Sequence, residues 1–148
     1  MYVIGGKSSQ FKTKCCYFCK ESLDMNIVET DMHIFVECRI ARLVWHCINQ
    51  RLQGAYLDTI VLNESNIFYK RGIEKPQSHL ISEVNWALWK NRCSNVYDET
   101  LNSHTAVLKF LFNRLKLVSK IDKAILGIRA YNNRWLGLNQ VIEALDDN

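Results

Sequence analysis

The chain has 148 residues, of which 48% are hydrophobic, 23% charged and 11% aromatic. These fractions suit a chain that buries one core, and with six glycines and one proline they disfavour intrinsic disorder and a loop-rich β-sandwich. The formal net charge of +4 is a mild basic excess, which suits a nucleic acid or another acidic partner without requiring one.

Residues 1–14 contain a Gly-Gly pair and a polar KSSQ run, and we expect them to form a flexible arm. They lack the apolar stretch of a signal peptide, and no run of about twenty apolar residues occurs in the sequence. We therefore expect no contact with a membrane and a location inside the cell, in the nucleus or the cytoplasm. Six cysteines in such a compartment are expected to be free thiols or metal ligands.

A cysteine and histidine motif follows the arm. It reads Cys16-x2-Cys19, then thirteen residues, then His33-x4-Cys38. Two cysteines two residues apart hold one metal ion from a tight turn, and tetrahedral zinc takes a second pair of ligands from elsewhere. The motif thus predicts a Zn²⁺ site, with His33 on a loop or strand end and Cys38 in the first turn of a helix. Four protein ligands leave no open position, so the expected role of the ion is structural.

Other interpretations of this motif are open. Cys15 could replace Cys16 in a C-x3-C pair, or the cysteines could be ordinary buried residues of the core. A redox role for the C-x-x-C pair would need a βαβ unit, which the sequence does not predict. Cys47 and Cys93 lie on apolar helical stripes and are expected in the core.

The rest of the chain predicts helices. Apolar residues recur at three- and four-residue steps over residues 39–52, and Gly54 marks the end of that helix. Residues 57–69 are ambiguous between a short strand and a poor helix. Pro76 begins a helix that runs to about Cys93; it is apolar on almost every face, so it lies at the centre of the core or against a partner.

A third long helix is predicted to begin at Ser103 as its N-cap. It should carry one apolar face, which includes Val107, Leu111 and Ile125, and a back rich in lysine. Two short elements follow, over residues 129–136 and 138–145. The predicted fold is mainly α, a small helical domain with an N-terminal zinc finger. We expect the finger and its helix to occupy residues 15–53, with a helical domain over 54–148 packed on them as one unit.

The segment CYFCKESLDMNIVETDMHIFVECRIARLVW resembles the zinc-binding region that follows the polymerase in many non-LTR retrotransposon reverse transcriptases. The resemblance rests on the four ligands, a Glu-Thr pair, a His-Leu-Phe-like triplet and a later tryptophan, which here are Cys16, Cys19, Glu29, Thr30, His33, Ile34, Phe35, Cys38 and Trp45. Residues 87–99, ALWKNRCSNVYDE, are similar to an aliphatic-Trp-Lys-x-Arg segment found after that finger. No Tyr-x-Asp-Asp polymerase motif occurs, so the resemblance implies a detached C-terminal piece or a product that has lost its enzyme.

The resemblance and the basic residues together predict a non-catalytic region that binds RNA or DNA, with a reverse transcriptase core or another protein as a possible further partner. Phosphate contacts are expected from cations near the finger and on the helices, namely Lys12, Lys14, Lys20, Arg39, Arg42, Lys90, Arg92, Lys109, Lys116, Lys120 and Lys123. The simpler interpretation is that these side chains form solvated helix faces. The four tryptophans are expected to be core anchors rather than platforms for bases.

Two alternatives remain from the sequence. The first is a protein-interaction module, in which the apolar helix that begins at Pro76 packs on a partner and the zinc is purely structural. The second is a residual metal-dependent nuclease, for which Asp98, Glu99 and Lys109 are the nearest candidates. No G-x-S-x-G, P-loop or H-E-x-x-H motif occurs in the sequence.

Overall fold

A computed structural model of the chain describes residues 15–143. The predicted arm, the candidate contacts Lys12 and Lys14, and the end of the last predicted helix lie outside the described residues. Residues 15–143 form helices and no β-strand, which confirms the mainly α fold. In chain order the elements are α1 (Tyr17–Leu23), the π-helical turn η2 (His33–Glu37), α2 (Arg39–Gly54), the π-helical turn η3 (Ser65–Tyr69), α3 (Lys75–Tyr97), α4 (His104–Ile125), α5 (Ile128–Trp135) and α6 (Leu138–Glu143).

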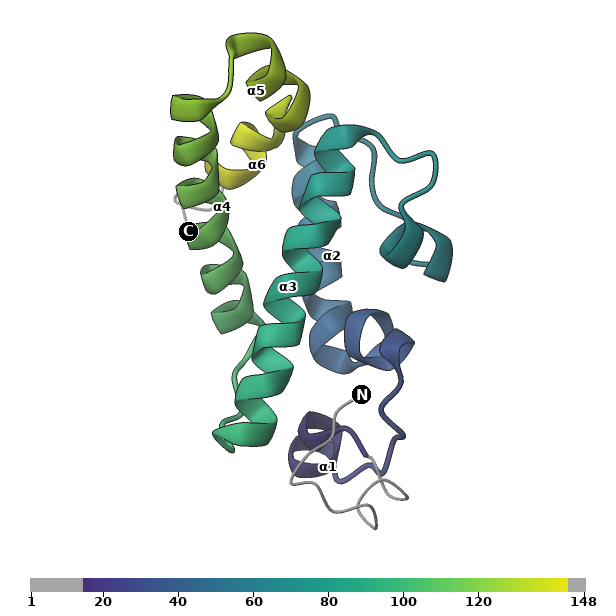
Figure 1. The fold of residues 1–148 in the computed structure, drawn as a ribbon. Helices are drawn as coiled ribbons and strands as arrows, with labels where there is room; N and C mark the ends of the chain where they lie inside the picture. The colour runs from purple at the N-terminus through teal and green to yellow at the C-terminus, as the bar shows by residue number, and fades with distance from the viewer. Residues whose placement is uncertain (1–14, 144–148) are drawn as a thin grey trace.

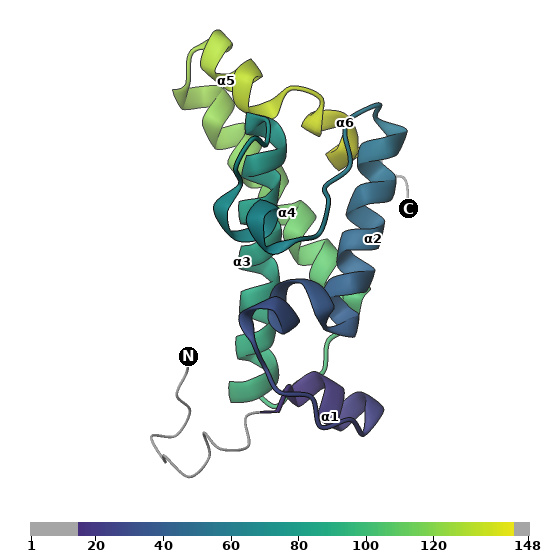
Figure 2. The same cartoon turned by 90° about the vertical axis from the view of Figure 1, so that its right-hand side faces the viewer.

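The long helix α3 is the central element. It contacts α1 and η2 on one side of the molecule and α4 and α5 on the other. α4 also packs on α2, so these three helices form the body of the domain, with α1 at one end and α5 and α6 at the other (Figures 1 and 2). The sequence left open whether α3 is buried in the core or against a partner. It is apolar on several faces because it is surrounded by the chain's own helices.

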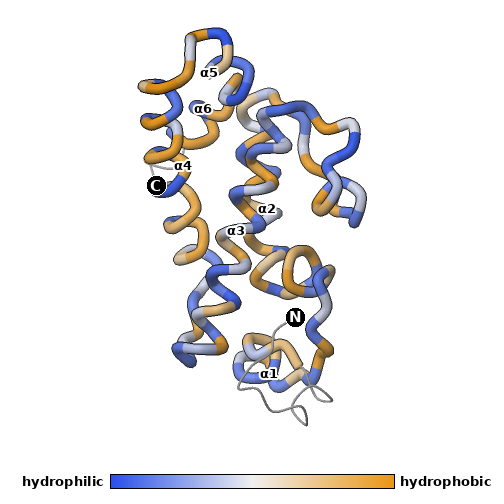
Figure 3. The backbone as a smooth tube through the Cα atoms, in the orientation of Figure 1, coloured by the Kyte–Doolittle hydropathy of each residue, from blue (hydrophilic) through white to orange (hydrophobic). Residues whose placement is uncertain are grey.

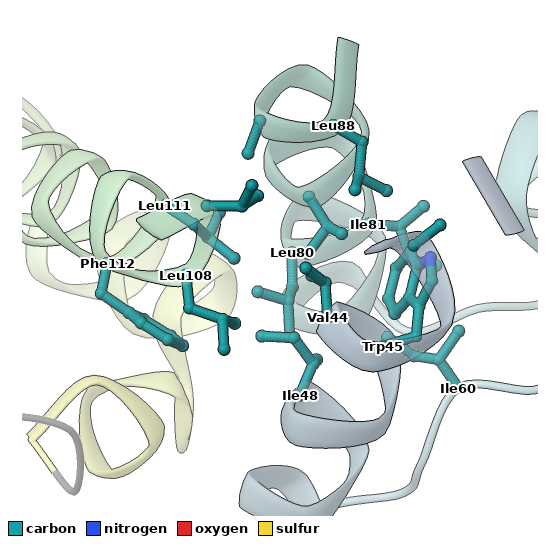
Figure 4. Close-up of a cluster of buried hydrophobic side chains, with 14 of the residues drawn as sticks. Val44, Trp45, Ile48, Ile60, Leu80, Ile81, Leu88, Leu108, Leu111 and Phe112 are labelled. Carbon is teal, nitrogen blue, oxygen red and sulfur yellow. The ribbon is translucent and has the colours of Figure 1, made fainter. Parts of the chain in front are cut away.

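The core lies between α2, α3 and α4. Val44, Ile48, Leu80, Ile81 and Leu111 are each exposed by 1% or less and point toward one another (Figure 4). Each such side chain contributes about 1.5–3 kcal/mol when it is fully removed from water. The periodic apolar positions of three separate helices therefore meet in one cluster.

The tryptophans divide into two groups. Trp45 and Trp135 are fully buried, and the Trp45 Nε1–H donates a hydrogen bond of 2.8 Å to the carbonyl of Phe35. These two are core anchors, as predicted. Trp86 is 45% exposed and Trp89 is half-buried, so the prediction is wrong for Trp86, because α3 turns that side chain outward next to α4.

The beginnings of the helices follow the sequence closely. α2 starts at Arg39, α3 carries Pro76 in its first turn, and α4 starts after Ser103, whose hydroxyl accepts a hydrogen bond from the backbone N–H of Ala106. One expectation about the third helix is wrong: Ile125 is 70% exposed. The buried residues of α4 end at Asp122, so its last turn lies beyond the core.

Residues 57–69 form neither the strand nor the helix considered for them. Residues 57–62 have no regular structure, and η3 follows. The side-chain amide of Asn49 on α2 replaces a strand partner, because it accepts a hydrogen bond of 2.8 Å from the N–H of Ile60 and donates one of 3.0 Å to the carbonyl of the same residue. Across residues 15–143, no helix combines the length and the apolar character that crossing a bilayer requires.

A buried carboxylate joins the end of α4 to α5. Asp122 is 6% exposed and accepts hydrogen bonds from Trp135 Nε1 at 2.9 Å and from Arg134 at 3.0 Å. Burial acts to raise the pKa of Asp122, but the bonds from Trp135 and Arg134 outweigh it, and the pKa lies below its usual value of 3.8. The ionised form of Asp122 therefore stabilises the contact between α4 and α5.

We predict that Asp122→Asn lowers the free energy of unfolding at neutral pH by about 1–2 kcal/mol, because it removes two charge-assisted hydrogen bonds. Since the folded-state pKa of Asp122 is depressed, its contribution is complete above the ordinary pKa of 3.8 and is lost as the pH falls through the lower folded-state value. Urea unfolding of both proteins from pH 7 to pH 3 measures the difference. A difference that stayed constant down to pH 3 would contradict this assignment.

Candidate metal centre

Cys16, Cys19, His33 and Cys38 come together as a closed cluster of four possible metal ligands. Their ligand atoms all lie within 4.8 Å of one another, and each residue is exposed by 6% or less. The Sγ atom of Cys38 lies 3.9 Å from those of Cys16 and Cys19, and Cys19 Sγ lies 3.5 Å from His33 Nε2. A tetrahedral zinc with ordinary bond lengths needs edges of about 3.8 Å between sulfurs and about 3.6 Å between sulfur and nitrogen. The three separations of 3.9, 3.9 and 3.5 Å match these edges closely.

Each ligand is placed by the end of a helix. Cys16 is the N-cap of α1 and Cys19 lies in its first turn, which points both sulfurs to one side. Cys38 is the N-cap of α2, where the positive end of the helix dipole favours a thiolate, as the sequence indicated. α1 has only seven residues, so its position depends on what it is attached to.

The expected setting of His33 is wrong. It does not end a strand or lie in a loop but begins the π-helical turn η2. The Thr30 hydroxyl accepts a hydrogen bond of 3.0 Å from the N–H of His33, and the His33 carbonyl accepts one of 2.7 Å from the N–H of Cys38. This wide turn, five residues long, places the last two ligands side by side. π-helical turns are rare and carry no simple sequence signature.

Cys15 is not part of the cluster. It is half-buried, and its backbone forms an isolated antiparallel bridge with Val28. The next N–H, that of Cys16, donates a hydrogen bond of 2.8 Å to the carbonyl of Ile27. These bonds orient Cys16 toward the cluster, so the C-x2-C pair is the one that the fold assembles.

The three thiols do not ionise alike. The hydrogen bond between Cys16 and Cys38 lowers the pKa of Cys16 to about 4 and raises that of Cys38, while burial raises the pKa of Cys19. Three thiolates in one buried cluster repel one another unless a cation compensates them. A divalent ion in this position would supply that charge, and its binding would release protons.

A buried ion pair connects the loop between the two ligand pairs to α3. The Glu29 carboxylate accepts hydrogen bonds from Arg92 Nη2 at 2.7 Å and Nε at 3.0 Å, and the two side chains are only 5% and 8% exposed. The pair brings together the two segments on which the family resemblance rests. It also corrects the expectation that Arg92 contacts nucleic acid, because the guanidinium is buried against Glu29.

The other candidate cations lie on the surface, in more than one place. Lys20 is on α1, Arg39 and Arg42 are on α2, Lys90 is on α3, and all of these are exposed. Lys90 lies 5.8 Å above the ring of Phe110 on α4, so part of its charge is engaged in a cation–π contact. The candidate cations on α4 are Lys109, Lys116, Lys120 and Lys123. Lys116 is half-buried and the other three are exposed.

A groove between α2 and α4 gathers part of this charge. It encloses about 800 Å³, and Arg51, Lys109 and Lys116 line it together with His104 and several uncharged residues. The lining, taken within residues 15–143, includes no carboxylate. Sequence reasoning missed Arg51 and His104. The signal that could have found them is the complete lack of Asp and Glu in residues 39–54, next to a helix with a basic back.

The nuclease candidates do not assemble. Asp98 lies at the C-terminal end of α3, where Ser94 is its neighbour, and Glu99 is exposed in the turn that follows. Between residues 15 and 143, the cysteine and histidine cluster is the one group of three or more His, Cys, Asp or Glu ligands close enough to share an ion. Asp98 and Glu99 are not members of it.

Comparison of the chain with protein-family models, with curated proteins and with solved structures finds no match. The resemblance to the retrotransposon finger therefore rests on the residues quoted above. The candidate metal site is inferred from the geometry of its four side chains, independently of any relative.

We predict that Glu29→Gln lowers the free energy of unfolding by about 3–5 kcal/mol, since it leaves the buried guanidinium of Arg92 without a compensating charge. The matched control is Glu83→Gln, which breaks the pair between α3 and α4 with Arg114, a side chain that is 41% exposed. That change should cost about 0–1 kcal/mol because water replaces the lost partner. Urea unfolding of the metal-loaded proteins measures both, and equal losses would contradict the buried character of the first pair.

Proposed function

We propose that the metal is zinc and that its role is structural. Three sulfurs and one nitrogen within 4.8 Å of one another form a donor set typical of structural Zn²⁺, whereas Mg²⁺ and Ca²⁺ prefer oxygen ligands. All four positions belong to protein side chains, so no position remains for a reacting water. The ion joins α1 to η2 and to the start of α2.

This proposal predicts about one zinc per purified chain and its loss in Cys19→Ser. Because the ion holds α1 and the start of α2, the variant should also unfold at a lower temperature than the wild type. Cys93→Ser is the control, since Cys93 is half-buried on α3 and outside the cluster. Elemental analysis gives the metal content, and replacement by Co²⁺ should produce the absorption of tetrahedral thiolate coordination. Wild-type protein that is fully folded without metal would exclude a structural role.

We further propose that the chain binds nucleic acid in the groove between α2 and α4. The observation that carries the proposal is the lining of that groove, with Arg51, Lys109 and Lys116 and no carboxylate among the described lining residues. Cations gathered in a hollow raise the local concentration of phosphate more than the same cations spread over a convex face. Non-specific binding to the backbone of RNA or DNA needs little else.

The sequence of α2 supports the same groove. Residues 39–54 contain cations and no acid, and the acid of α4, Asp122, is buried in its contact with Trp135 and Arg134. The two helices that border the groove therefore contribute cations to its lining and no exposed acid. Cys38 caps α2, so the proposed zinc would also hold one wall of the groove.

In this view the chain resembles, in function as in its motifs, the non-catalytic C-terminal region of a non-LTR retrotransposon reverse transcriptase. The ligand spacing supports that origin, and so does the meeting of the two motif segments at Glu29 and Arg92. Polymerase activity would belong to a region that is absent from this sequence.

The test is a filter-binding comparison of single-stranded RNA, single-stranded DNA and duplex DNA at several salt concentrations. We expect affinity to fall as salt rises, and the double variant Lys109→Gln, Lys116→Gln to reduce the slope of log K against log salt by about 1.4 on single strands. The control, Arg71→Gln with Lys75→Gln, removes two exposed charges outside the groove. Equal effects of the two double variants would refute the groove, and absence of binding at low salt would refute the function.

A further inference from the structure

The outer face of α4 carries an exposed apolar ridge. Leu117, Ile121 and Ile125 recur every fourth residue, so they lie in one row along the helix, and Ile128 at the start of α5 is the next exposed aliphatic residue in the chain. Their exposed fractions are 59%, 48%, 70% and 82%. Hydrophobic residues recur along the length of α4, which forms one edge of the molecule (Figures 1 and 3). We call Leu117, Ile121 and Ile125 the α4 ridge.

The exposed charges around the α4 ridge are positive. Lys120, one residue before Ile121, is exposed beside the row, and Arg129 is exposed one residue after Ile128, whereas Asp122, the acid within residues 109–134, is buried and hydrogen-bonded. Exposed aliphatic side chains in a row with cations at the rim are unusual for a helix that only faces water. A covering partner would need an apolar stripe to bury and negative charge to meet the rim.

We propose that the α4 ridge docks an amphipathic helix of an acidic partner protein. The three residues of α4 span eight positions, about 12 Å or two helical turns, which is the length over which anchors at i, i+4 and i+7 of a second helix make contact. Aspartate or glutamate at the edges of that helix would face Lys120 and Arg129. The ridge is a single row, so it suits one packed helix better than the broad apolar face with which a helix enters a membrane.

Charge argues against a second copy of this chain as the occupant. In a symmetric dimer through this face the same patch meets itself, so Lys120 of one copy would approach the cations beside the ridge of the other. Such a contact places like charges together at the edge of the buried area, which costs affinity. An acidic helix avoids that cost.

The α4 ridge is separate from the groove proposed for nucleic acid. Lys109 and Lys116 line the groove beside α2, while Leu117 and Ile121 lie roughly 100° or more around α4 from Lys116. Side chains of the ridge do not line the groove. The inference therefore does not rest on the proposed nucleic-acid function, and either can fail alone.

The experiment uses the full chain in its metal-loaded form and a labelled helical peptide of about three heptads, with leucine at the core positions and glutamate at the flanks. We expect the peptide to bind, as measured by fluorescence anisotropy, and a peptide of the same composition in scrambled order to bind more weakly. Leu117→Ser and Ile121→Ser should each weaken binding roughly tenfold or more if they are central anchors. The matched control Val61→Ser removes an aliphatic side chain that is 63% exposed elsewhere and should leave binding unchanged.

Because the ridge residues are exposed, the variants should keep the thermal stability of the wild type, and a melting curve checks this. The inference is overturned if the ordered and scrambled peptides bind equally, or if the ridge variants bind as well as Val61→Ser. It is also overturned if sedimentation shows a wild-type dimer that Ile121→Ser dissociates, which would identify a second copy as the occupant. Binding to anionic phosphatidylserine vesicles that is lost in Ile121→Ser, without peptide binding, would assign the ridge to a membrane instead.

Discussion

The meeting of three thiols and one imidazole is the constraint on which the N-terminal part of this molecule depends. α1 is a seven-residue helix, too short to persist alone, and its principal neighbour is α3. The cluster ties it to η2 and to Cys38, the residue before α2, so one ion would hold α1 against the junction of η2 and α2. The buried pair of Glu29 and Arg92 adds a second connection from the same loop to α3. With its cation in place, this end of the molecule is a rigid extension of the helical core.

Two buried carboxylates attach the ends of the molecule to its centre. Glu29 connects the metal loop to α3, and Asp122 connects the end of α4 to α5 through Trp135 and Arg134. In both cases an ionised oxygen accepts more than one N–H, which is how a charge is retained away from water. Apolar packing between α2, α3 and α4 holds the body together, and these polar contacts specify how the short outer helices are attached to it.

α4 presents two chemically different faces beside the one buried in the core. Lysines face the groove with α2, and an aliphatic row faces away from it, with no described carboxylate exposed on this helix. A nucleic acid and an acidic helix could therefore occupy the same helix without competing for the same side chains. Taken together, the two proposals describe a module that connects a nucleic acid to a protein, in which the proposed zinc has a structural role.

The sequence by itself determined the four residues of the cysteine and histidine cluster, the helical class and the beginnings of the three long helices, because spacing, capping residues and apolar periodicity are local signals. It did not determine the π-helical turn at His33 or the side-chain pairing of Asn49 with Ile60, since both depend on hydrogen bonds that several conformations could satisfy. The tertiary structure alone decided where each cation lies. Arg92 pairs with an acid 63 positions away, while Arg51 joins two lysines of another helix. A sequence lists the charged residues, but only the packing of the helices decides which of them share a surface and which form ion pairs.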